Sequence, residues 1–275
     1  MTHRAAAYGF WGIRGAGALA VALLLVVSSG CTDPAPHPAT DIDAYLDTVI
    51  AAHGGDVLDR AVVRFTFRGD AFTLCRNAGR FRYERATTDS LGRAVVEGLT
   101  NTDVYRVVAG DTVALSPDAR GAVATAVNSV AYFALLPYPL QDPPVQATYA
   151  GPDTVAGAAY HRVAVSFDQG GGQDYEDVFL YWFAQDDHAM DYLAYAFGVG
   201  GPAADRGTRF REATNVRTVG GVRWADYENY RAPTLGPSSL ARYPSAWAND
   251  AVEHVSTVAL QDISVTPIAG QEAAP

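Results

Sequence analysis

Alternation between apolar and polar residues is the feature that most limits what this chain can fold into. In 63–68, valine and phenylalanine alternate with arginine and threonine, and in 80–84, aromatic residues alternate with arginine and glutamate. Because successive side chains of a strand point to opposite faces, this period of two predicts antiparallel strands with one solvated face. Turns are predicted between them at 69–70 and 77–79.

Similar patterns predict strands along most of the remaining sequence. The run 178–183 is apolar without a break, so both faces of that strand are expected to be covered. The further predicted strands lie near 93–99, 103–108, 111–115, 145–150, 159–167, 174–184, 189–198, 207–219, 222–231 and 251–265.

Two segments have a helical period instead. Apolar residues recur at helical spacing from Ile42 to Ile50, after a cap at Thr40 or Asp41 and before Gly54-Gly55. A second, largely buried helix is predicted within 119–136, where prolines follow. Together these elements predict a mainly β (α+β) fold: a curved antiparallel sheet or half-barrel, with an N-terminal and an internal helix on its concave side.

The first 31 residues have the pattern of an export signal. Two arginines precede the apolar run 18–27, and Ser28-Ser29-Gly30 precedes Cys31. The run is too short to span a membrane, which takes about 20 apolar residues. We therefore expect a lipoprotein signal peptide with Cys31 acylated. An ordinary secretory signal is the alternative, because Ser28 stands at the position where lipoprotein signals prefer leucine. By resemblance to Gram-negative sorting signals, Thr32 in place of aspartate implies the outer membrane.

These boundaries give a predicted domain organisation. Residues 1–30 form the signal peptide, 31–40 the lipidated cysteine with a proline-rich tether, 41–268 a single β-rich domain and 269–275 a disordered tail. The membrane is then the predicted partner through the N-terminal lipid.

Charge excludes several functions. The formal net charge is −10 and the chain contains no lysine. An acidic chain is a poor match for nucleic acid, which rewards clustered cations. Schiff-base and pyridoxal-phosphate chemistry and the Walker A loop all need a lysine amine, so they are excluded.

The two cysteines allow two interpretations. If Cys31 is acylated, Cys75 is a single thiol, and its strand-like surroundings predict a small buried hydrophobic residue. If Cys31 is not acylated, a Cys31–Cys75 disulfide becomes available in an oxidising compartment.

The sequence contains no strong catalytic or metal-binding motif. There is no H-E-x-x-H, C-x-x-C or G-x-S-x-G, and 186–188 (Asp-Asp-His) is more typical of a solvated turn than of a metal site. The acidic segment 170–177 is likewise interpreted as a hairpin end rather than a calcium loop. No catalytic residue, cofactor or metal is therefore predicted, although a hydrolase with residues assembled in space stays open.

Aromatic residues gather in the middle of the chain and are the candidate binding residues. We expect them to line an apolar cavity between sheet and helices, with tyrosine hydroxyls at its mouth. The alternative is a filled hydrophobic core. The candidates are Tyr132, Phe133, Tyr181, Trp182, Tyr192 and Tyr195.

Several phrases carry a resemblance to known proteins: 52–55 (AHGG), 65–69 (FTFRG), 79–85 (GRFRYER), 128–133 (NSVAYF) and 190–195 (MDYLAY). Over about 41–265 the chain resembles an uncharacterised family of cell-envelope lipoproteins of Bacteroidota and related bacteria. Its helix, His-Gly-Gly and first strands are also similar to lipoprotein-sorting proteins of the LolA/LolB type. That likeness implies a curved half-barrel closed by helices around an acyl-binding cavity.

The sequence thus predicts a lipoprotein anchored to the outer membrane, facing the periplasm, that binds a hydrophobic or amphipathic ligand such as an acyl chain without catalysis. An envelope hydrolase and a scaffold lipoprotein without a small ligand are the alternatives. Protein partners are not predicted.

Overall fold

A computed structural model describes residues 36–168, 176–202 and 206–269. The chain divides into two compact units, Met1–Pro34 and Ala35–Pro275, and both β-sheets belong to the second unit. The predicted signal peptide, Cys31, the first part of the tether, most of the 170–177 loop and the tail from 270 lie outside the described residues.

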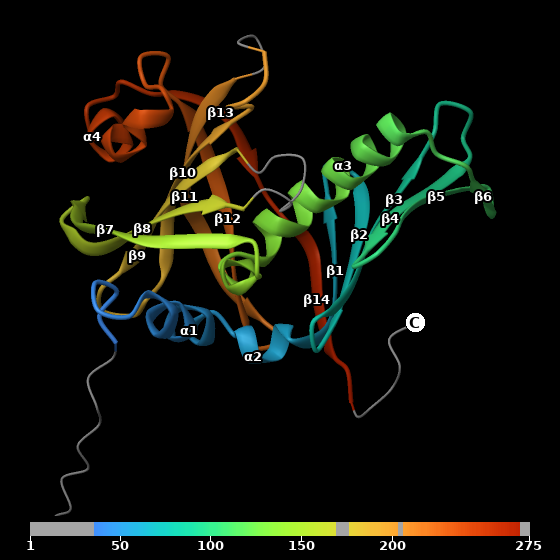
Figure 1. Cartoon of the computed structure of the whole chain (residues 1–275), viewed down its shortest axis with the longest axis horizontal. Coiled ribbons are helices and arrows are strands. Elements are labelled where there is room, and N and C mark those ends of the chain that lie inside the picture. The colour runs from blue at the N-terminus through green and yellow to red at the C-terminus, as the bar shows by residue number, and fades with distance from the viewer. Residues whose placement is uncertain (1–35, 169–175, 203–205, 270–275) are drawn as a thin grey trace, which may run out of the picture. The chain divides into compact units, whose positions relative to one another are not determined.

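Antiparallel strands form a first seven-stranded sheet in the order β14-β1-β2-β3-β4-β5-β6 (Figure 1). Strands β1 to β6 each pair with their neighbour in sequence through a short turn. Strand β14 is the exception, because it pairs with β1. The strands are β1 (Arg60–Phe67), β2 (Asp70–Asn77), β3 (Arg80–Thr88), β4 (Ala94–Thr100), β5 (Val104–Val108), β6 (Asp111–Val113) and β14 (Gln261–Pro267).

A second seven-stranded antiparallel sheet has the order β13-β12-β11-β10-β9-β8-β7. The mainly β fold with antiparallel strands and few helices is confirmed, and its strands are divided between two hydrogen-bonded sheets. The strands of the second are β7 (Val145–Val155), β8 (Ala158–Phe167), β9 (Val178–Ala184), β10 (Met190–Phe197), β11 (Gly207–Val219), β12 (Val222–Arg231) and β13 (Glu253–Val258).

The predicted helices are confirmed, with capping residues at their first turns. The Asp41 carboxylate accepts the Ala44 N–H (3.0 Å) at the start of the first long helix, and the Ser116 hydroxyl accepts the Ala119 N–H (3.3 Å) at the start of the second. The helices are α1 (Ile42–Ala52), α2 (Gly55–Leu58), α3 (Pro117–Leu135), α4 (Tyr243–Ala248) and the 3₁₀ segments η1 (Tyr138–Gln141) and η3 (Pro237–Arg242).

Helix α3 contacts both sheets (Figure 1). Its buried stripe, Val123, Val127 and Ala131, packs with the inner face of the first sheet. Near its C-terminal end, Tyr132 and Phe133 pack against the second sheet instead. Helix α3 therefore contributes side chains to the cores of both sheets.

The second sheet is covered on both faces. On β9, Tyr181 and Phe183 belong to a core under α1 and η1, whereas Leu180 and Trp182 belong to a second core under η3 and α4. All four side chains are buried. The prediction that both faces of this strand are covered is therefore confirmed.

The segment predicted as one strand, 251–265, is divided into β13 and β14, which belong to different sheets. Asp226 on β12 explains the break: its carboxylate accepts the Leu260 N–H (3.2 Å), while Arg217 donates to the Leu260 carbonyl (2.7 Å) and to Asp226 (3.0 Å). The side chains that hold this break belong to β11 and β12. The sequence of 251–265 by itself therefore does not indicate that two strands are present.

The prediction for Cys75 concerns burial, whereas the apolar run 18–27 lies outside the described residues. Cys75 is buried, with 4% of its surface exposed, and it is a free thiol, as predicted for a small hydrophobic position. Within the described ranges, no helix is long and apolar enough to cross a membrane.

Candidate functional site

A cavity of about 230 Å³ lies between the C-terminal half of α3, the strand β12 and the end of β1. Its apolar lining residues include Phe67, Val130, Phe133, Leu136, Trp224 and Leu260. Its polar lining residues include Ser129, Arg211, Arg223, Tyr227, Asn229 and His53. Small-molecule sites usually combine apolar surface with converging polar groups, and this cavity offers both.

Strand register places the main polar groups side by side. Arg211 on β11 is the direct partner of Asn229 on β12 and of Leu193 on β10, so the three side chains share the inner face of the second sheet. Arg211 and Asn229 are both buried, with 8% and 7% of their surfaces exposed. The sheet therefore presents a guanidinium and an amide together at the cavity wall.

Arg211 is held by aromatic rings. Its guanidinium carbon lies 3.9 Å from the centroid of the Phe133 ring, and Nη2 donates to the Tyr195 hydroxyl (3.1 Å). Nε is buried and has no hydrogen-bond partner within the described ranges. Among the described residues no carboxylate forms an ion pair with Arg211, so its buried charge is uncompensated.

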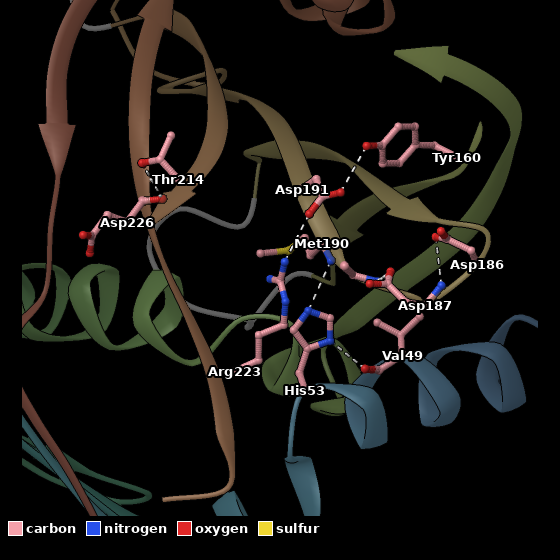
Figure 2. A network of polar contacts seen from close by, with 11 residues as sticks. Val49, His53, Tyr160, Asp186, Asp187, Met190, Asp191, Thr214, Arg223 and Asp226 are labelled. Atoms are coloured by element: carbon pink, nitrogen blue, oxygen red, sulfur yellow. Dashed lines mark hydrogen bonds and ion pairs between the residues drawn. The ribbon is translucent and has the colours of Figure 1, made fainter. Parts of the chain in front are cut away.

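The second arginine of the wall, Arg223, has a carboxylate partner. Its Nη2 lies 3.1 Å from Asp191 Oδ1, and the Tyr160 hydroxyl donates to the other oxygen of Asp191 at the same distance (Figure 2). Burial raises the pKa of the Asp191 carboxyl, while Tyr160 and Arg223 act in the opposite direction. The Arg223 charge is thus largely satisfied within the protein.

His53 is held in place by backbone groups on both ring nitrogens (Figure 2). Nδ1 donates to the Val49 carbonyl (2.8 Å) and Nε2 accepts the Met190 N–H (3.2 Å), which joins the end of α1 to the start of β10. Burial lowers the pKa of His53 to about 4, so the ring is neutral at physiological pH. With both nitrogens engaged, His53 is not available as a base for Ser129.

Tyr227 is a further polar residue that lines the cavity. Burial raises its pKa to about 12, with Arg223 and Arg211 opposing that shift. The phenol is therefore protonated at physiological pH and offers a neutral O–H beside two guanidinium groups. The arrangement supplies donors and apolar surface, which suits ligand binding.

The structure separates the six predicted binding residues. Phe133 lines the cavity, and Tyr195 reaches it through Arg211. The hydroxyls of Tyr132 and Tyr181 bond each other (2.8 Å) inside the neighbouring core.

Trp182 and Tyr192 lie on the other face of the second sheet. The Trp182 indole donates to Asp153 (2.9 Å), and Tyr192 stacks on Phe210, 5.6 Å between ring centroids. Both belong to the core under η3 and α4, and neither lines the cavity.

Sequence reasoning missed Arg211, Tyr227 and Asn229. A signal was present: in 207–219, Arg209 and Arg211 flank Phe210, and alternation then puts both arginines opposite a buried aromatic. From the sequence, an arginine on the face opposite Phe210 is expected to be solvated, because the sequence does not show that both faces of the second sheet are covered.

No cluster of three or more histidine, cysteine, aspartate or glutamate side chains in the described ranges has metal-binding geometry. The 186–188 segment forms the turn between β9 and β10, as interpreted from the sequence. There the Asp187 carboxylate accepts the Ala189 N–H (2.9 Å), and the His188 ring packs edge-on against Tyr45.

Comparisons with known proteins identify a family. Residues 53–246 match the model described as a family of unknown function (DUF6503). The predicted likeness to an uncharacterised family is confirmed in this form, while its assignment to Bacteroidota stays a prediction. No curated protein matches the chain.

Solved structures with a related arrangement of elements were also found. They include a LolA superfamily protein from Nitrosomonas europaea (TM-score 0.46, 10% identity, 81% of this chain and 94% of that chain covered). A domain assigned to outer membrane lipoprotein sorting from Vibrio parahaemolyticus has a TM-score of 0.41 (6% identity, 82% and 93% covered). A DUF1329 family protein from Desulfovibrio piger has one of 0.39 (10% identity, 86% and 96% covered). At such low similarity, the function has to be inferred from this chain's own residues.

Proposed function

The chain belongs to the family of unknown function DUF6503, and we propose that it binds a hydrophobic or amphipathic ligand, such as an acyl chain, without catalysis. The observation that carries the proposal is the cavity beside α3, which is lined by apolar residues such as Phe133 and Trp224 and by polar groups that include Arg211. Apolar ligand surface buried there contributes about 25 cal/mol per Å².

A non-catalytic role is supported by the state of the cavity's titratable groups. His53 is neutral and engaged on both nitrogens, and Arg223 is paired with Asp191. Tyr227 is a protonated phenol. These groups hold positions and donate hydrogen bonds, and none of them is set up to move a proton during a reaction.

Location is part of the proposal. We place the chain at the outer membrane, held by acyl groups on Cys31 and facing the periplasm. The basic and apolar segments before Cys31 support this, as does Thr32 after it. Stable anchoring takes more than one acyl chain.

Native mass spectrometry of the full chain, released from non-ionic detergent micelles, tests ligand and anchor together. A bound ligand adds a mass that is lost on denaturation, whereas lipid on Cys31 survives denaturation and is absent from Cys31→Ser. Cys75→Ser is the control and should keep the covalent mass. Absence of any ligand mass, together with no uptake of a fluorescent fatty acid, would contradict the binding proposal and favour a scaffold role.

A cavity-filling variant tests whether the ligand occupies this site. Ala134 lines the cavity, so Ala134→Leu should reduce uptake of a fluorescent fatty acid at least about tenfold by steric exclusion. Ala122 is exposed on the same helix, and Ala122→Leu should bind as the wild type does. Equal uptake by both variants would place the ligand elsewhere.

A further inference from the structure

We infer that the cavity selects an amphiphile with one apolar chain and an anionic head group, and that Arg211 and Asn229 bind the head. This rests on the proposed function and adds the chemical class of the ligand. The inference starts from a buried positive charge for which the protein supplies no counter-ion among the residues that the structure describes.

Arg211 differs from the other arginine of the same wall. Arg223 is paired with Asp191, whereas Arg211, 8% exposed, is stacked on Phe133 and, among the residues that the structure describes, is hydrogen-bonded only to the Tyr195 hydroxyl. Buried charges in proteins are normally paired, because leaving one unpaired costs free energy. An anion in the cavity would supply the missing partner and recover that cost.

The nearest acidic side chains along the two strands point away from the cavity. Glu212 follows Arg211 and accepts from the Tyr230 hydroxyl (3.2 Å). Glu228 precedes Asn229 and is held by His254 (2.6 Å) and Thr257 (2.9 Å). Alternation puts both carboxylates on the opposite face of the sheet from Arg211. No rearrangement of side chains alone brings either of them to Arg211.

Asn229 provides a second incomplete group at the same place. Its Oδ1 is buried and has no hydrogen-bond partner in the part of the chain that the structure describes, and its Nδ2 lies 3.4 Å from the Ser256 hydroxyl oxygen. A half-turn of the amide would let Oδ1 accept the Ser256 hydroxyl hydrogen and direct Nδ2 as a donor beside Arg211. The two strand partners would then present adjacent donors, which is the pattern a carboxylate or phosphate accepts.

Size and lining define the remainder of the ligand. About 230 Å³ is slightly below the usual range of small-molecule sites, roughly 300–1,000 Å³, so it suits one chain rather than several. The Phe133 ring lies against the Arg211 guanidinium, and Val130 and Trp224 also line the cavity. A single apolar chain attached to an anionic head would place its charge at Arg211 and its chain against these apolar side chains.

Calorimetric titration of the purified full chain at pH 8 with three probes tests the inference. Dodecanoate and dodecyl phosphate carry an anionic head, and dodecanol has the same chain without charge. We expect both anions to bind about tenfold or more tightly than dodecanol, since hydrogen bonds to charged groups are the stronger ones. The tighter of the two anions identifies the head group as carboxylate or phosphate.

Variants assign the selectivity to Arg211. In Arg211→Gln the advantage of the anions over dodecanol should disappear, while dodecanol still binds and shows that the variant is folded. Arg211→Lys should retain part of the advantage, because the charge remains without the planar fork. Arg209→Gln is the matched control: Arg209 lies two residues away on the same face of β11, stacks on Phe197 at 5.0 Å and does not line the cavity.

The outcomes separate this inference from the proposed function. Equal affinity for dodecanol and the anions, or an anion preference that survives in Arg211→Gln, overturns the inference and leaves ligand binding in place. Failure of all three probes to bind overturns the proposed function as well.

Discussion

Arg211 of β11 lies against the face of Phe133 of α3, with its guanidinium carbon 3.9 Å from the ring centroid. A buried cation is thus held by an aromatic ring from a helix rather than by a carboxylate from the sheet. The pair joins α3 to the second sheet at the wall of the cavity.

A double-mutant cycle with Phe133→Leu and Arg211→Met should measure this contact. We expect a coupling free energy of about 1–2 kcal/mol, because a cation–ring contact is stronger when it is desolvated. The free energy of unfolding in urea gives the four values needed. The less buried pair Arg209 and Phe197, 5.0 Å apart, is the control and should couple more weakly. A coupling near zero at Phe133 would show that the stacking contributes no stability.

His53 should make stability depend on pH. The unfolded chain takes up a proton near the ordinary pKa of 6.5, and the folded chain does so only near 4, because burial lowers the pKa of the ring. Stability therefore falls as pH falls from about 6.5 to about 4, by about 3 kcal/mol in total, and this contribution levels off below. Urea unfolding at several pH values measures it.

His53→Gln is the comparison for that experiment, since Gln carries no titrating group. The wild type should lose stability relative to His53→Gln across the stated range. His254→Gln, at a half-exposed site on β13, should retain the wild-type loss in that range. Parallel curves for wild type and His53→Gln would mean that the buried ring is not the source.

Glu97 on β4 should be the carboxylate whose loss destabilises the first sheet most. It lies between Arg85 (2.6 Å) and Arg106 (2.5 Å), and only 6% of its side chain is exposed. Glu97→Gln leaves two arginines without their shared partner and should cost about 3 kcal/mol.

Glu253 gives the matched control for Glu97. Its ion pair with Arg231 is as short, 2.6 Å, but both side chains are more than half exposed. Glu253→Gln should change the free energy of unfolding by about 1 kcal/mol at most. Similar losses for the two variants, measured by urea unfolding, would contradict the role of burial.

Gly54 should be far less tolerant of substitution than Gly69, although both have a positive φ, +83° and +89°. A Cβ at Gly54 would lie 2.2 Å from the Gly221 carbonyl oxygen, whereas nothing lies within 4 Å of a Cβ at Gly69. Gly69→Ala should cost about 1 kcal/mol from the backbone alone, and Gly54→Ala about 2 kcal/mol more. Thermal unfolding of both variants measures the difference, and equal losses would show that the turn after α1 can move away from β12.

Regular periodicity explains which parts of the fold could be predicted. The stripe from Ile42 to Ile50, the strands 207–219 and 222–231 and the internal helix all carry a local pattern, and the structure contains each of them. The division between β13 and β14 depends on Asp226 and Arg217, which are distant in sequence, so no local pattern marks it.

The candidate site was harder to predict for a related reason. On β9 every residue is apolar, so the sequence does not tell which face Tyr181 and Trp182 take, and Trp182 lies away from the cavity. Arg211 was missed because a cation on a strand is usually solvated. Only the positions of α3 and β12 reveal that this one is enclosed.

The pairing of β1 with β14 has a consequence for how the protein is made. Ala61 of β1 pairs in register with Pro267 of β14, so the first sheet acquires this edge strand only after all strands of the second sheet have been synthesised. Contacts between such distant segments form slowly because a long loop must close first. Until β14 arrives, β1 presents an unpaired strand edge, and such an edge is open to pairing with other chains.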